Sequence, residues 1–194
     1  DRDDLVLMQW APSASVAAVF TRNRFCAAPV LVARENLANQ PVAAIINSGN
    51  ANAGTGIPGL QATRTSCELA ADVVDCNANQ VLPFSTGVIG ELMPTAPFES
   101  ALPEAAKQLS ETNWQSAANA ILTTDTRPKG ASQQLTIDGR TITITGICKG
   151  SGMIRPDMAT MLGYVATDAC INQTDLQQAL KAAVDGSFNR ITVD

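Results

Sequence analysis

Residues 146–162 read GICKGSGMIRPDMATML, and the rest of the chain is interpreted around this stretch. The glycines at positions 150 and 152 allow positive φ and a close approach to a ligand, and Pro156 excludes a helix through the segment. The apolar run at 161–166 predicts that a strand follows. Thr160 is therefore expected where an ordered loop enters a sheet, which is a common place for a nucleophile.

The chain contains no histidine, so a Ser–His or Cys–His pair within it cannot activate a nucleophile. A Thr hydroxyl then needs another base. The α-amine of an N-terminal Thr is suitable, because its unperturbed pKa is about 7.7–8.0. This route requires cleavage of the bond between Ala159 and Thr160, which the residue pattern by itself leaves a hypothesis.

Four stretches carry the functional signal, and they occur in the order VFTRNRFCAAPV (19–30), NSGNANAGTG (47–56), STGVIGE (85–91) and KGSGMIRPDMATML (149–162). Together they resemble the motifs of the ornithine acetyltransferase family, the bifunctional glutamate N-acetyltransferases, over nearly the whole chain. The last stretch resembles that family's self-cleavage motif, with the cut between Ala159 and Thr160.

The resemblance implies roles for individual residues. Thr160 is the nucleophile and contacts substrate, Thr86 and Gly87 form the oxyanion hole, and Thr126 and Lys149 bind substrate. Without the resemblance, the residue patterns favour plainer interpretations: a turn at 85–87, an ordinary loop threonine at 126, and a solvated surface lysine at 149. The Asn- and Gly-rich loop at 47–56 either supports its neighbours or lines the site.

The activity that the resemblance implies is acetyl transfer from N2-acetylornithine to glutamate through acetyl-Thr160, a step of arginine biosynthesis. It implies no cofactor, although acetyl-CoA is a co-substrate of bifunctional members. Residues 1–159 would form the α-chain part and residues 160–194 the start of the β-chain part, in a heterotetramer of two α and two β chains. Family chains are about twice as long, so residues 1–194 are expected to be one N-terminal α/β domain whose partner is the missing C-terminal half.

Two rival interpretations stay open. A related self-processing aminopeptidase or amidase would use the same Thr and oxyanion hole but release the acyl group to water. A non-catalytic binding domain, or an inactive fragment of the enzyme, would form no acyl adduct on Thr160.

Composition narrows the function classes. The net charge of −5 and the lack of a basic cluster argue against a nucleic acid or an anionic membrane as partner. No apolar run reaches the ~20 residues needed to span a bilayer. The five cysteines have no metal-like spacing, so we expect free thiols, no metal and a cytoplasmic location.

The predicted fold is α/β, with a mixed sheet layered with helices; the resemblance implies a sandwich that functionally resembles the N-terminal-nucleophile hydrolases. An Asp-Gly pair between alternating runs predicts a type I′ hairpin at 134–145. Helices are predicted at 58–77, 98–110, 113–123 and 174–187, the last capped by Thr174. Further strands are predicted at 5–10, 15–20, 30–33, 42–46, 81–84, 161–166 and 190–194.

Overall fold

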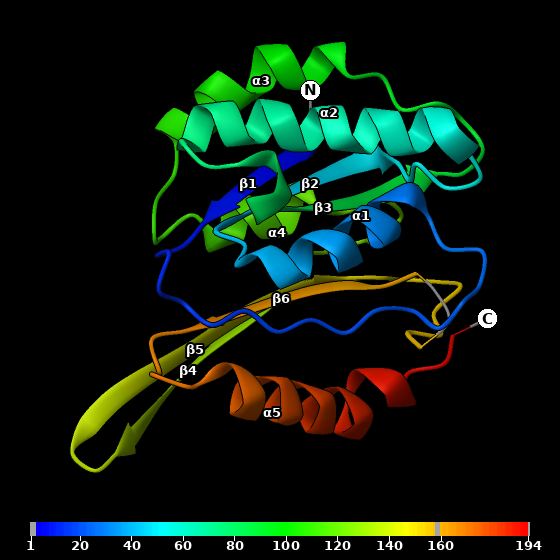
Figure 1. Ribbon diagram of the computed structural model, residues 1–194. Helices are drawn as coiled ribbons and strands as arrows, with labels where there is room; N and C mark the ends of the chain where they lie inside the picture. Colours follow the sequence, from blue (N-terminus) through cyan, green and yellow to red (C-terminus); the bar gives the residue numbers. More distant parts are fainter. Residues whose placement is uncertain (1–2, 158–159, 194) are drawn as a thin grey trace.

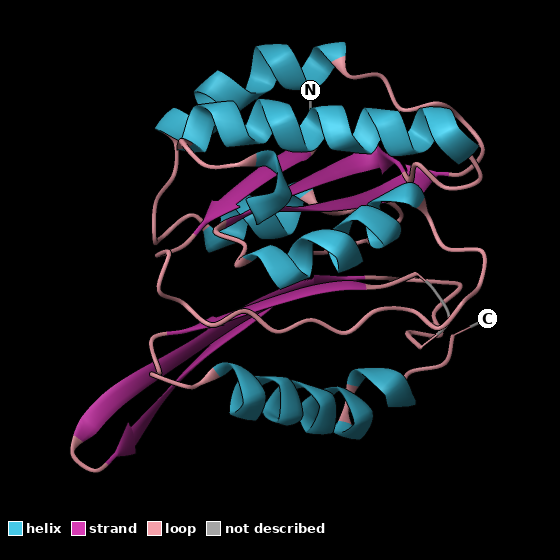
Figure 2. Cartoon of the chain, viewed as in Figure 1, coloured by secondary structure: helices cyan, strands magenta, loops and turns pink. Residues whose placement is uncertain are grey.

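The computed structural model describes residues 3–157 and 160–193 and shows the predicted α/β class, with helices layered on two sheets (Figures 1 and 2). Helices α2 (Gly56–Val74) and α3 (Ala96–Lys107) cover one face of the first sheet. Helix α4 (Trp114–Ala120) lies between the two sheets, and α5 (Gln173–Gly186) lies beyond the second.

The first sheet has the strand order β1-β2-β3. Strand β1 (Leu5–Gln9) is antiparallel to β2 (Ala43–Asn50), and β3 (Val81–Val88) is parallel to β2. The all-apolar start of β2 is buried on both faces, because successive side chains of a strand point in opposite directions. Ile45 packs toward α2 and α3, and Ile46 packs toward α4 and the second sheet.

The second sheet is antiparallel and joins β4 (Lys129–Ile137), β5 (Arg140–Lys149) and β6 (Leu162–Thr167). Asp138 and Gly139 turn between β4 and β5 with φ of 50° and 75°, which confirms the predicted type I′ hairpin. The last residue of β5, Lys149, pairs with the first residue of β6, Leu162. The glycine-rich stretch is therefore the loop of a second hairpin.

The strand prediction for 30–33 is wrong, because these residues lie in helix α1 (Ala28–Asn36). A four-residue apolar run does not distinguish a strand from a buried helix. Pro29 favours the helical choice, since its fixed φ suits the first turn. Helix α1 then packs against β3 and α2.

Three further predictions need correction. Residues 15–20 belong to no strand; the backbone N–H groups of Val16 and Ala18 donate instead to the side chains of Gln173 and Gln177 on α5. The end of the chain forms a 3-10 helix (Phe188–Arg190) and a single bridge from Val193 to Ile154, not the strand predicted at 190–194. The cap of α5 is Asn172, whose side chain accepts from the backbone N–H of Asp175, and not Thr174.

Two short 3-10 helices complete the fold, at Leu37–Asn39 and Ala78–Gln80. All five cysteines carry free thiols. Among the described helices, none combines the length and the apolar character required to cross a bilayer.

Candidate active site

Thr86 and Gly87 lie inside strand β3, so the turn that the residues alone suggested at 85–87 is wrong. The parallel ladder continues past the apolar part of the strands and pairs Ser48 with Thr86 and Gly49 with Gly87. Gly87 has φ of 131°, and a Cβ there would lie 2.3 Å from the carbonyl carbon of Gly49. Only glycine fits this close approach.

The loop at 47–56 is fixed by its own side chains. Asn52 is fully buried at φ of 47°, and its amide donates to the carbonyl of Gly59 at 2.9 Å and to the hydroxyl of Thr63 at 2.8 Å. Its side-chain oxygen accepts from Thr55 at 2.7 Å. These contacts favour the interpretation that the loop supports its neighbours.

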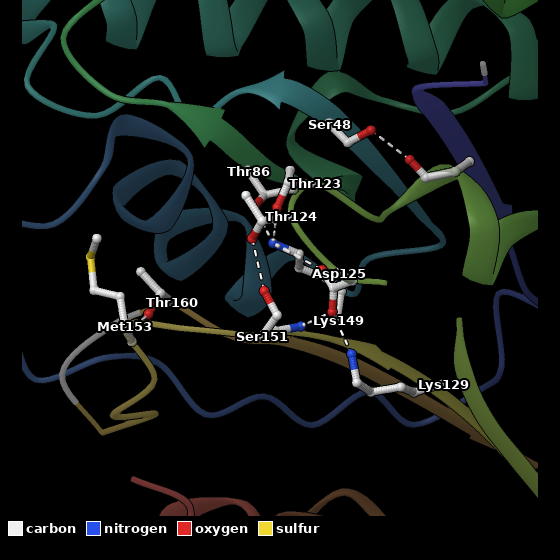
Figure 3. A network of polar contacts seen from close by, with 12 residues as sticks. Ser48, Thr86, Thr123, Thr124, Asp125, Lys129, Lys149, Ser151, Met153 and Thr160 are labelled. Carbon is white, nitrogen blue, oxygen red and sulfur yellow. Dashed lines mark hydrogen bonds and ion pairs between the residues drawn. The ribbon is translucent and has the colours of Figure 1, made fainter. Parts of the chain in front are cut away.

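Lys149 is buried at the end of β5, with 8% of its side chain exposed, so the surface role that residue pattern alone favoured is wrong. Residues two apart on a strand share a face, and Lys149 follows the buried Ile147 toward the core between the sheets. Its Nζ donates to Thr86 Oγ1 at 2.9 Å and to Thr123 Oγ1 at 2.7 Å (Figure 3).

The hydroxyls of Thr86 and Thr123 accept bonds from Lys149, so each can still donate its own proton to a ligand. An ammonium group can only donate, so Thr86 and Thr123 are acceptors toward Lys149. Among the described residues, neither hydroxyl has an acceptor for its proton. Thr86 therefore presents a polarised O–H next to the backbone of Gly87, which is the type of donor that an oxyanion requires.

Asp125, in the loop that follows α4, belongs to the same group of contacts. We call this group the corner; its residues are Thr86, Gly87, Thr123, Asp125, Lys149 and Gly150. Its Oδ1 accepts from the backbone N–H of Gly150 at 2.8 Å and from Lys129 Nζ at 2.5 Å, and its Oδ2 lies 3.9 Å from Lys149 Nζ. Burial of this carboxyl favours a higher pKa, but the bonds from Lys129 and Gly150 and the charges of Lys129 and Lys149 outweigh it, so the pKa of Asp125 is lowered. The corner therefore carries a carboxylate shared by two ammonium groups.

Sequence reasoning assigned no role to Thr123 or Asp125, and their signal was the polar run TTDTRPK that interrupts the apolar pattern after α4. Thr124, in the same run, bonds to Ser151 at 2.8 Å across the corner. Thr126 is exposed, and no described residue forms a hydrogen bond with its hydroxyl. The structure thus brings Thr86, Gly87 and Lys149 together and leaves Thr126 at the rim.

Thr160 lies near the end of the loop between β5 and β6, two residues before β6 begins. A Cβ on Gly150 would lie 3.3 Å from the carbonyl oxygen of Thr160, so the two backbones are in contact next to Lys149. The Thr160 side chain is exposed, and its hydroxyl donates to the carbonyl of Met153 (Figure 3). The predicted cleavage partner, Ala159, lies outside the described residues.

Thr160 also has φ of 73°, a left-handed conformation. This conformation is unfavourable for a β-branched residue and costs on the order of 1–3 kcal/mol. The residue predicted to follow the cut is therefore held in a strained backbone.

Comparison with known proteins identifies relatives along the whole chain. The model of the ArgJ family matches residues 1–194. The chain is 54% identical to the arginine biosynthesis bifunctional protein ArgJ of Pseudomonas syringae pv. tomato and 55% identical to that of Methylococcus capsulatus. Each match takes in 100% of this chain but 48% and 47% of the relatives, so the chain spans about half the length of the curated relatives that it matches.

Two solved structures have the same fold. The crystal structure of the arginine biosynthesis bifunctional protein ArgJ from Bacillus halodurans matches with a TM-score of 0.68 and 32% identity, over 83% of this chain and 92% of that chain. An ornithine acetyltransferase from Mycobacterium tuberculosis, solved with ornithine, matches with a TM-score of 0.68 and 30% identity, over 82% and 84% of the two chains. The family model matches residues 1–194 and curated ArgJ relatives are more than half identical to the chain, so the chain belongs to the ArgJ family.

Proposed function

We propose that this protein transfers the acetyl group of N2-acetylornithine to glutamate through acetyl-Thr160, after it cleaves itself between Ala159 and Thr160. One arrangement carries the assignment: Lys149 holds the hydroxyl of Thr86, while the adjacent Gly150 packs against Thr160. The backbone of Thr160, the proposed nucleophile, thus lies beside Gly150, and the neighbouring Lys149 bonds to Thr86, the proposed oxyanion donor. The activity is proposed for this chain together with the C-terminal half by which the family's members exceed it.

The first half of the reaction forms the acetyl enzyme. After cleavage, the α-amine of Thr160 takes the hydroxyl proton as Thr160 Oγ1 attacks the acetyl carbonyl carbon. The carbonyl oxygen becomes an oxyanion, which accepts bonds from the Thr86 hydroxyl and the Gly87 backbone N–H. Collapse breaks the C–N bond, and the departing nitrogen of ornithine takes the proton from the Thr160 ammonium.

The second half reverses these roles. The glutamate amine attacks the acetyl ester, the same donors stabilise the new oxyanion, and the Thr160 hydroxyl regains its proton as acetylglutamate leaves. Lys149 keeps Thr86 oriented in both halves, because its ammonium occupies the acceptor side of that hydroxyl. Direct contact of Lys149 and Thr126 with substrate is a part of the proposal that rests on the family resemblance.

The lengths of the relatives support self-cleavage. The match to the solved Bacillus halodurans chain covers 83% of this chain and 92% of that chain, so the two chains are similar in length. The curated relatives are about twice as long. A short solved chain beside long relatives is what a cut near residue 160 would produce. Strain at Thr160 supports it further, because cleavage releases that backbone.

The assembly and location form the remaining part of the proposal. We place two α and two β chains in a heterotetramer in the cytoplasm, with no cofactor and with acetyl-CoA as a further acyl donor in a bifunctional protein. The matches to bifunctional proteins and to an ornithine-bound structure support small-molecule substrates of this class.

The decisive experiment compares Thr160→Ala with the wild type, both in this chain and in a version extended beyond Asp194. Intact mass and N-terminal sequencing should find a new N-terminus at Thr160 in the wild type and none in Thr160→Ala, which should also lose acetyl transfer. Thr174→Ala, at an exposed threonine of α5, is the control and should behave as the wild type. Transfer retained by Thr160→Ala would remove Thr160 from its role.

The products separate the rival functions. Acetylornithine and glutamate should yield acetylglutamate and ornithine, whereas free acetate alone would indicate an amidase. A wild-type protein that is cleaved but never acetylated on Thr160 by an acetylated amino acid would indicate a binding domain.

A further inference from the structure

The motif at 19–30 has no part in the proposed chemistry, yet its first half is held firmly in place. The guanidinium of Arg34, on α1, lies 5.5 Å from the centre of the Phe20 ring and donates to the carbonyl of Thr21. Arg34 also lies 3.9 Å from the sulfur of Cys26. Helix α1 contributes Val32 to the core between the first sheet and helices α2 and α3. The bonds from Arg34 therefore tie the backbone at Thr21 to this packed core.

From this anchored segment, two residues bind Asp157. The backbone N–H of Arg22 donates to the carbonyl of Asp157 at 2.7 Å, and the hydroxyl of Thr21 donates to the same oxygen at 3.4 Å. The Arg22 guanidinium forms an ion pair with the Asp157 carboxylate, which also lies 3.5 Å from Arg155 Nε. Asp157 is thus held through both its backbone and its side chain by residues about 135 positions earlier in the sequence.

Asp157 lies three residues before Thr160, so its contacts act close to the proposed cleavage site. Residues 158–161 separate Asp157 from Leu162, where the ladder between β5 and β6 begins. The described chain is therefore held on both sides of Thr160, by the contacts of Asp157 before it and by the ladder that begins at Leu162 after it. Pro156, immediately before Asp157, limits the motion of the loop further.

We propose that Thr21 and Arg22 form a brace that holds Asp157 and thereby positions the backbone leading into Thr160 for self-cleavage. This inference rests on the proposed function. An intramolecular attack requires the reacting atoms about 3–3.5 Å apart, and a misplacement of about 1 Å can slow a reaction by ~10²-fold. Arg22 and Asp157 are positioning residues, since they act through the loop and contact no reacting atom.

The test follows the cleavage rate, measured by intact mass after synthesis of the full-length protein. Asp157→Asn and Arg22→Gln should each slow the appearance of the Thr160 N-terminus by about 10–100-fold. Their urea midpoints should match the wild type, because exposed ion pairs contribute little to global stability. Glu35→Gln removes another exposed ion pair between distant segments, Arg64–Glu35, and should leave the cleavage rate unchanged.

Salt and charge reversal separate positioning from simple loss of structure. Raising NaCl from about 0.05 M to about 1 M should slow wild-type cleavage and leave Asp157→Asn unaffected, because screening acts only on an intact exposed pair. The double variant Arg22→Asp with Asp157→Arg should cleave faster than either reversed single variant.

Three results would contradict the proposal. If the wild type cleaves and Asp157→Asn cleaves at the same rate, the brace has no role in cleavage and the proposed function is untouched. If the wild type never yields a Thr160 N-terminus, both proposals fail together. A slowed variant that also melts early, with no salt effect in the wild type, would assign Asp157 a structural role only.

Discussion

At the residue scale, Asp125 is the group on which the polar corner depends. It bonds to the backbone N–H of Gly150 and to Lys129 and lies near Lys149, with its side chain completely buried. Replacing a charged acceptor of this type leaves two ammonium groups without their shared counter-charge. We expect Asp125→Asn to lower the free energy of unfolding at pH 7 by about 1–3 kcal/mol.

The pH dependence of this loss follows from the direction of the pKa shift. The folded-state pKa of Asp125 is lowered, so its stabilisation is fully present above the unfolded value, about 3.9. It disappears as the pH falls through the lower folded value. Urea unfolding should therefore show a gap between wild type and Asp125→Asn at pH 7 that narrows below about pH 4.

A conservative change elsewhere supplies the control. Asp138→Asn replaces Asp-Gly with Asn-Gly in an exposed type I′ turn, and both pairs suit that turn. It should not change stability at either pH. A gap for Asp125→Asn that is equally large at low pH would show that shape, not charge, makes Asp125 necessary.

Lys149 shows what residue patterns could not predict. A lone lysine beside glycines is usually solvated, and nothing in its immediate neighbours indicates burial. Its burial follows from partners far away in sequence, since Thr86 lies 63 positions earlier and Thr123 lies 26 positions earlier. Only the family resemblance pointed to Lys149 and Thr86, and it did not point to Thr123 or Asp125.

At the element scale, the C-terminal end of β3 packs against β2 so closely that only glycine fits at position 87. A Cβ on Gly87 would lie 2.4 Å from the carbonyl oxygen of Gly49 and 2.7 Å from the backbone nitrogen of Asn50. Either the β2–β3 ladder opens or the strand shifts, and both move Thr86 away from Lys149. Gly87→Ala should cost on the order of 3 kcal/mol of stability and abolish acetyl transfer.

Gly186→Ala is the matched control for this change. Gly186 ends α5, where an added Cβ meets nothing within 4 Å. Thermal unfolding and acetyl-transfer assays should show no loss for this variant. A Gly87→Ala protein with an unchanged midpoint would contradict the packing described for β3.

The elements that sequence predicted well are those specified locally. The β4–β5 hairpin carries its own turn signal, and α2 carries helical spacing over five turns. The strand prediction for 15–20 failed for the opposite reason. Gln173 and Gln177, one helical turn apart on α5, bond to the backbone of Val16 and Ala18, and this pairing has no local signature.

At the scale of the whole molecule, the described residues form two cores that share the first sheet. One lies between that sheet and α2 and α3, and the other lies between the two sheets. The uninterrupted apolar run at 42–46 is typical of a strand buried on both faces, and β2 is buried in this way. The division of the strands into two sheets was not predicted, because long-range pairing sets it.

Strand β6 and helix α5 follow the bond at which we propose self-cleavage, and both are tied to residues before that bond. Six residue pairs join β6 to β5, and Tyr164 contacts Phe84 edge to face at 5.2 Å. Gln173 and Gln177 bond the later part to residues 16–18. The two products of the proposed cleavage would therefore share a sheet and part of a core.

We expect the cleaved protein to remain one particle. Size-exclusion chromatography under native conditions should give a single peak, and denaturing mass spectrometry of that peak should find both products in equal amounts. Thr160→Ala, which stays uncut, should elute at the same volume and serves as the reference. Separation of the products without denaturant would contradict the β5–β6 pairing. Thr160 lies two residues before β6, so we expect the proposed cleavage to supply the α-amine while Thr160 stays beside Gly150.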